Sequence, residues 1–243
     1  MKRKNFFYAL TIILAISACK KPDIKKALNF PETSYKTLES YDTTGKPANL
    51  LKDTISANLM YFIDTLLPAG RDAVKAHPEF FGDTINNDIV ITRPSDVYMT
   101  FVSQGAGYKN SIGFYTYNTG QPPITPDDVK TITYAFPSAG NNTPLKAGDK
   151  IKLGKFNAGT TIGLVVMQGA WNPDTKSPDN DVLHFCTDAI LNPEGSSSLT
   201  QHAVLVNYAT ENKLIFGFED LARTLPNCDN DFNDVVFYCV VNP

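Results

Sequence analysis

The residues most able to do chemistry lie in one acidic segment near the C-terminus. Positions 219–234 hold a single cation, Arg223, and five carboxylates, which are Glu219, Asp220, Asp229, Asp231 and Asp234. Unit charges about 4 Å apart repel by roughly 4 kcal/mol at an effective dielectric of about 20. A loop that holds several such pairs close together therefore needs a counter-ion or retained protons.

The spacing within this segment predicts a cation of the calcium type. Asp229, Asp231 and Asn233 follow D-x-D-x-N, the pattern that brings alternate oxygen side chains onto one centre in calcium loops. Ligands that are all oxygen suit a hard cation. An EF-hand is excluded, because Asp234 and Val240 stand where that loop needs Gly and Glu. A solvated loop of Asx turns is the alternative. The predicted ligands are Glu219, Asp220, Asp229, Asp231, Asn233 and Asp234.

Two apolar runs rich in β-branched and aromatic residues flank the segment, at 214–218 and 235–241. Both runs predict strands, so we expect the acidic segment to be a loop at one end of a sheet. Glu219 and Asp220 are neighbours on the incoming strand. In a regular strand their side chains point to opposite faces, and we expect one of them to reach the ion.

The N-terminus has the features of an export signal. Basic residues at 2–4 precede an apolar run over 6–16, which is too short to span a membrane as a stable helix. The sequence then reads Ile16-Ser17-Ala18-Cys19, which resembles the lipobox of bacterial lipoproteins. This resemblance implies a signal peptide over 1–18 and lipidation of Cys19, which would anchor the protein to the membrane.

Charge narrows the possible partners. Removal of the signal peptide takes away three of the 22 basic residues and none of the 25 acidic ones, so the mature formal charge is −6. This charge excludes a nucleic-acid binder, because no basic stripe is present to neutralise phosphates. The negative charge also disfavours electrostatic attachment to acidic membrane lipids, so the lipid attached to Cys19 is the expected anchor. Lys20 stands where an inner-membrane retention signal has Asp, so we expect the outer membrane and possible exposure at the cell surface.

Three cysteines remain after Cys19, and an odd number leaves at least one thiol unpaired within the chain. Cys186 and Cys239 lie in apolar runs and are expected to be buried small hydrophobic residues. A disulfide from Cys228 to either of them stays open as an alternative.

The remaining sequence predicts a mainly β fold, an antiparallel β-sandwich or jelly roll with an N-terminal helical segment. Apolar residues at three- and four-residue spacing predict a helix over 49–67. The expected regions are a signal peptide at 1–18, a tether at 19–48, a helical segment packed on the sandwich at 49–82, and the β-sandwich at 83–243. The expected strands are 88–92, 97–103, 112–117, 129–136, 150–156, 161–168, 182–187, 203–208, 214–219 and 235–241.

The acidic segment also carries a family resemblance. GFEDL at 217–221 and DNDFNDVVF at 229–237 resemble the domain of unknown function in LruC-type bacterial surface lipoproteins. The resemblance extends over about 55–241, and the acidic motif is its specific part. It implies a β-sandwich on the cell surface with a calcium site at the acidic motif, and it implies no activity.

Enzyme chemistry finds little support in the sequence. No G-x-S-x-G occurs, and no pair of carboxylates is marked out for glycoside hydrolysis. Trp171, with Tyr108 and Tyr115, is a candidate platform for sugar rings, although aromatic residues of a sandwich more often belong to its core.

We therefore expect a non-catalytic module that binds or adheres to a glycan or a protein. One alternative is a structural component of an envelope assembly, docked through Leu59, Phe62 and Ile63 of the predicted helix. The other is a hydrolase of extracellular polysaccharide.

Overall fold

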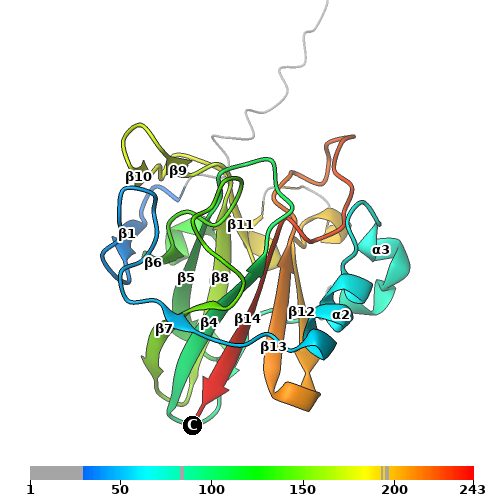
Figure 1. Ribbon diagram of the computed structural model, residues 1–243, viewed down its shortest axis with the longest axis horizontal. Helices are drawn as coiled ribbons and strands as arrows, with labels where there is room; N and C mark the ends of the chain where they lie inside the picture. Colours follow the sequence, from blue (N-terminus) through cyan, green and yellow to red (C-terminus); the bar gives the residue numbers. More distant parts are fainter. Residues whose placement is uncertain (1–29, 83–84, 193, 195–196) are drawn as a thin grey trace, which may run out of the picture.

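The computed structural model describes residues 30–82, 85–192, 194 and 197–243. These residues form a mainly β fold in which two six-stranded sheets pack face to face (Figure 1). The expected antiparallel β-sandwich is therefore confirmed. The expected signal peptide and Cys19 lie outside the described residues. Within them, no helix is both long and apolar enough to cross a membrane.

The first sheet, sheet I, has the order β1-β6-β5-β8-β11, and β3 also pairs with β8. Its pairs are antiparallel except for β1 with β6, which is parallel. Its strands are β1 (Ser34–Thr37), β3 (Ile89–Ile91), β5 (Ser111–Asn118), β6 (Thr131–Phe136), β8 (Thr160–Met167) and β11 (His184–Cys186).

The second sheet, sheet II, has the order β12-β13-β14-β4-β7-β2 and is antiparallel throughout. The strands β9 (Trp171–Asn172) and β10 (Ser177–Pro178) pair with each other and form a separate two-stranded ribbon. The strands of sheet II are β2 (Leu51–Lys52), β4 (Ser95–Ser103), β7 (Asp149–Phe156), β12 (Ala203–Tyr208), β13 (Lys213–Phe218) and β14 (Val235–Asn242). Each of the ten predicted strands occurs, with differences only at the strand ends.

Aromatic side chains from both sheets fill the space between them. Phe101 of sheet II meets Phe136 of sheet I edge to face, with ring centroids 6.5 Å apart. Phe216 and Phe237 stack within sheet II at 5.4 Å and face the same core. A fully buried side chain of this size contributes about 1.5–3 kcal/mol to folding. The sandwich is therefore held mainly by apolar contact between the sheets.

The predicted helix over 49–67 is shorter in the structure, where α2 spans Ala57–Leu66. Its start is fixed by Ser56, whose hydroxyl accepts a hydrogen bond from the Leu59 amide as an N-cap. Leu51–Lys52 forms β2 and pairs with β7. Apolar periodicity alone extended the helix too far, because a short edge strand carries the same kind of residues.

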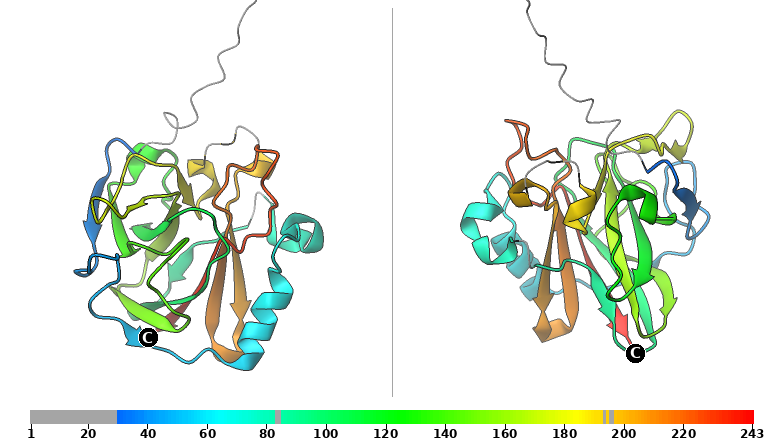
Figure 2. Two further views of the ribbon diagram at one scale, coloured as in Figure 1. Left: turned by 45° about the horizontal axis from the view of Figure 1, so that its top comes forward. Right: turned by 180° about the vertical axis from the view of Figure 1, so that it is seen from behind.

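The buried stripe of α2 consists of Leu59, Ile63 and Leu66. These side chains pack on the outer face of sheet II, against Ile215 and Val236 among others. Figure 2 shows the helix lying beside β12 and β13. The remaining helices of the described residues are shorter. They are α3 (Ala73–Ala76) and the 3-10 turns η1 (Pro78–Phe80), η2 (Pro126–Asp128), η3 (Ala189–Leu191), η4 (Ser197–Leu199) and η5 (Ala209–Glu211).

Part of the predicted tether is attached to sheet I through the edge strand β1. Phe30 is buried, and β1 pairs with β6 over four residues. The Tyr35 hydroxyl lies 2.9 Å from Nε2 of His184 on β11. The polar composition of this segment predicted a linker, because the sequence does not show the few ring contacts that hold it on the sheet.

Truncation of Leu59 tests the packing of α2. Leu59 is completely buried, so Leu59→Ala should lower the free energy of unfolding by about 2–5 kcal/mol. Tyr61 is 74% exposed on the same helix, and Tyr61→Ala should change it by roughly 0.5 kcal/mol or less. Urea unfolding of both variants measures the difference. Equal losses would contradict the orientation of the helix.

Candidate metal centre

The acidic loop occupies one end of sheet II. It joins β13 to β14, whose facing residues Phe218 and Val235 are paired immediately before and after it. In Figure 1 the loop rises at the end of the sandwich opposite the C-terminus. The sequence-based expectation of a loop between two paired strands is therefore confirmed.

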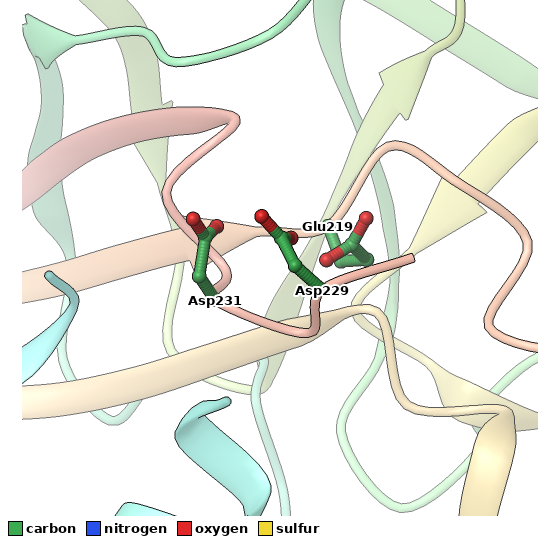
Figure 3. Close-up of side chains that lie close together, drawn as sticks. All are labelled: Glu219, Asp229 and Asp231. Atoms are coloured by element: carbon green, nitrogen blue, oxygen red, sulfur yellow. The ribbon is translucent and has the colours of Figure 1, made fainter. Parts of the chain in front are cut away.

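The five carboxylates of the loop converge around Glu219. One oxygen from each of Glu219, Asp229 and Asp231 lies within 4.8 Å of the others, and the same holds for Glu219, Asp220 and Asp234. Figure 3 shows the carboxyl groups of the first three side by side. Because Glu219 belongs to both groups, the structure brings all five predicted carboxylates to one place.

Glu219 and Asp220 both join the cluster, although neighbouring residues of a regular strand point to opposite faces. The regular strand β13 ends at Phe218. The Glu219 amide still donates to the His202 carbonyl oxygen at 3.0 Å, but the Asp220 amide donates to Oδ2 of Asp234 at 2.8 Å. The chain has left the pleat at this point, and the alternation of side chains no longer applies.

Left-handed backbone shapes the second half of the loop. Asn230 and Phe232 both have φ of 57°, a conformation that is strained for a residue as bulky as Phe. Burial of the Phe232 ring stabilises it there, since the ring is completely buried in the cluster under α2. A Cβ on Gly217 would lie 2.4 Å from the Phe232 carbonyl oxygen, so only glycine permits this approach. These features place Asp229 and Asp231 beside Glu219.

Asn233 has a positioning role in the structure. Its side-chain amide donates to Oδ2 of Asp231 at 2.9 Å and to the Leu67 carbonyl oxygen at 3.3 Å. The same Asp231 oxygen accepts the Gly70 amide at 2.7 Å. The turn after α2 therefore orients Asp231, a contribution that the spacing of the acidic residues did not predict.

Two further residues that sequence reasoning missed hold Asp220. Asn110, completely buried before β5, donates to Oδ2 of Asp220 at 2.5 Å, and Gln168 after β8 donates to its carbonyl oxygen at 2.7 Å. Both residues lie directly beside strands of sheet I. The cluster thus depends on both sheets, and no local motif in the sequence marks these distant partners.

The electrostatics of the cluster require compensation. Glu219 is 0% exposed and Asp220 2%, which counts against a solvated Asx loop. Burial first, and then repulsion from Asp234, raises the pKa of Glu219 to about 9 and that of Asp220 to about 7. Burial also raises the pKa of Asp231 and of Asp234.

The protein itself supplies little positive charge to offset the repulsion between these carboxylates. The guanidinium of Arg223 donates to Asn230 Oδ1 at 2.7 Å and to the Gln201 carbonyl oxygen at 2.9 Å. Within the part of the chain that the structure describes, it forms no ion pair. Oε2 of Glu219 is buried without a hydrogen-bond partner there. The donor set therefore fits a hard cation, because such an ion would bind the unpartnered oxygen and offset the repulsion.

The predicted aromatic platform does not form. Trp171 is buried in β9, where its ring meets Tyr41 edge to face, and Tyr115 is buried in β5. Tyr108 alone of the three is exposed. The rings of Trp171 and Tyr115 therefore pack in the interior and present no flat face to solvent.

The three described cysteines are free thiols. Cys186 and Cys239 are buried, as expected, and a disulfide from Cys228 to either of them is absent from the described structure.

Comparison with known proteins gives one finding. Residues 156–242 match the model of a family described as a domain of unknown function (DUF4114). The match runs from the end of β7 through β14 and includes the whole acidic loop. No curated protein and no solved structure matches the chain. The expectation of a domain of unknown function is thus confirmed for this part of the chain.

The raised pKa values predict a pH dependence in the absence of metal. Free Glu and Asp titrate near about 4, so between about pH 5 and 9 the folded protein holds protons that the unfolded chain has released. Stability in chelator should therefore fall as pH rises, by up to about 1.4 kcal/mol per pH unit for each such proton.

Thermal unfolding in chelator across this pH range measures the slope. The variant Glu219→Gln cannot release a proton at this position and should show a shallower decline than the wild type. Stability that rises with pH in the wild-type protein would contradict the description of the cluster.

Proposed function

We propose that this protein is a lipid-anchored surface protein whose β-sandwich is completed by a calcium ion at the acidic cluster. The observation that carries the proposal is the convergence of five carboxylates, three of them almost completely buried, around Glu219. Calcium takes six to eight oxygen ligands in flexible geometry and accepts carboxylates in one- or two-oxygen contact. Magnesium needs near-ideal octahedral geometry and retains water, which suits this crowded set less well.

The ligands in this proposal are Glu219, Asp220, Asp229, Asp231 and Asp234. Glu219 would supply its unpartnered Oε2 and join the two groups. Asn233 would orient Asp231 through its amide. The ion would bind the two ends of the loop together, and its role would be structural.

We further propose that the mature protein is anchored to the outer membrane through lipid at Cys19 and faces the cell exterior. We also propose that it is related to the LruC-type surface lipoproteins. Support comes from the lipobox-like N-terminus and from the acidic motif, which lies within the matched domain of unknown function.

The proposed role is binding or adhesion to a glycan or an extracellular protein, without catalysis. The carboxylates of the loop are held by backbone and amide donors at fixed positions, which suits ion binding better than acid–base chemistry. The alternative of an envelope component docked through α2 has less surface to use, because Leu59 and Ile63 are buried against sheet II. A polysaccharide hydrolase is the remaining alternative.

The variant Asp231→Ala tests the metal centre. An ion present at 100 times its dissociation constant stabilises the folded state by about 2.7 kcal/mol. For a protein of this size that corresponds to a rise of roughly 5–11 °C in melting temperature. We expect this rise with calcium for the wild type, a smaller one with magnesium, and none for Asp231→Ala. The measurement is thermal unfolding of the chain from residue 20 onward, which retains every described residue.

Asp174→Ala is the matched control, because Asp174 is an exposed acidic residue of the β9–β10 turn. It should keep the full response to calcium. Identical curves for the wild-type protein in calcium and in chelator would remove the metal centre from the proposal.

Glycan-array and envelope-protein binding of the same protein distinguish the roles. Binding that requires calcium and is lost in Asp231→Ala supports the module. The hydrolase would be favoured over the binding module if the protein cleaves a polysaccharide and one carboxylate substitution abolishes this activity while fold and metal are retained.

A further inference from the structure

A second pair of carboxylates meets at a break in the edge of sheet I. The strands β3 and β11 both pair with β8, on the side that β5 does not occupy. Ile89 of β3 faces Ile162, and Cys186 of β11 faces Val165. The same registers, continued by one residue from β3 and two from β11, bring both Asp88 and Asp188 opposite Gly163. The two short strands thus abut end to end, with one aspartate from each at the junction.

Two tyrosines of β5 reach across to this junction. Tyr115 faces Gly163 in the β5–β8 pair, and its hydroxyl donates to Oδ2 of Asp188 at 2.8 Å. A Cβ on Gly163 would lie 2.2 Å from the Tyr115 ring, so the absent side chain is what lets the ring cross β8. The Tyr117 hydroxyl donates to Oδ2 of Asp88 at 2.5 Å. Each carboxylate therefore accepts a tyrosine hydroxyl through its Oδ2.

The other oxygen of Asp88, Oδ1, is buried and has no hydrogen-bond partner among the described residues. Asp88 itself is 5% exposed. Burial and the neighbouring Asp188 raise the pKa of Asp88 to about 8, and burial raises that of Asp188. The other titratable groups that face the pair are Tyr115, Tyr117 and the Cys186 thiol. In the described structure neither carboxylate forms an ion pair with a basic side chain.

This pair is separate from the acidic loop. Gln168, which contacts Asp220 of the loop, is five residues further along the same strand direction than Gly163. At about 3.3 Å per residue the two positions are roughly 16 Å apart. A single ion cannot bridge that distance.

We infer that the junction of β3 and β11 is a second divalent-cation site, in which Asp88 and Asp188 bind a calcium-type ion and Tyr115 and Tyr117 position them. The unpartnered Oδ1 of Asp88 supplies the buried ligand. Asp188 is half-buried, so water can complete the coordination shell from its side. The competing occupant is a single proton shared between the two carboxyl groups.

Counting bound calcium tests the inference. Equilibrium dialysis of the chain from residue 20 onward, followed by elemental analysis, should find two ions per wild-type chain. Asp88→Asn should retain one ion, and Asp231→Ala should retain the other. Asp127→Asn removes an exposed carboxylate of η2 and should keep both. Terbium is the second probe, because ions held beside Tyr115 and Tyr117 emit when tyrosine is excited.

Terbium emission should be lost in Asp88→Asn and kept in Asp231→Ala. If Asp88→Asn does not fold, Asp188→Asn takes its place in both measurements. A calcium count and terbium emission equal to the wild type in the folded variant would overturn the site and leave a shared proton. Loss of the ion in Asp231→Ala alone would support the acidic loop and reject this junction, so the two sites fail independently.

Discussion

Repulsion among buried carboxylates is the constraint on which the end of this sandwich depends. Four acidic side chains lie around Glu219, and three of these five carboxylates are almost fully excluded from water. The surrounding structure holds them at close range in spite of that cost. Gly217 admits the Phe232 backbone, the Phe232 ring is sealed under α2, and Asn110 and Gly70 fix individual oxygens. Such an arrangement is stable only when positive charge enters it, either as protons or as a cation.

The same constraint explains why parts far apart in sequence are joined at this end. The loop belongs to sheet II, yet Asn110 and Gln168 lie directly beside strands of sheet I and Gly70 lies in the turn after α2. An ion at the loop would therefore act on the contact between the two sheets as well as on the loop itself. The matched domain of unknown function covers the loop and most of its support, whereas Asn110 and Gly70 lie before it.

Much of the fold could be predicted from the sequence, because period-two alternation and turn residues are local signals. The ten strands and the loop between β13 and β14 followed from them. The acidic ligands were visible for the same reason, since they are close in sequence. The failures concern long-range contacts. Leu51–Lys52 became a strand because β7 was available to pair with it, and Trp171 was buried by Tyr41. The carboxylates of Glu219 and Asp220 meet in one cluster because β13 stops before them. Asp88 and Asp188 are 100 positions apart, and only the registers on β8 unite them.

The parallel pair β1–β6 has a mechanical consequence. β1 is the first strand of the described residues, and it is held by four paired residues and by the Tyr35–His184 hydrogen bond. If lipid at Cys19 fixes the chain to a membrane, any pull on the sandwich reaches the fold through this strand first. The load then falls on the hydrogen bonds that pair β1 with β6. Under force, this short edge strand would detach from β6 before the remaining strands of either sheet separate.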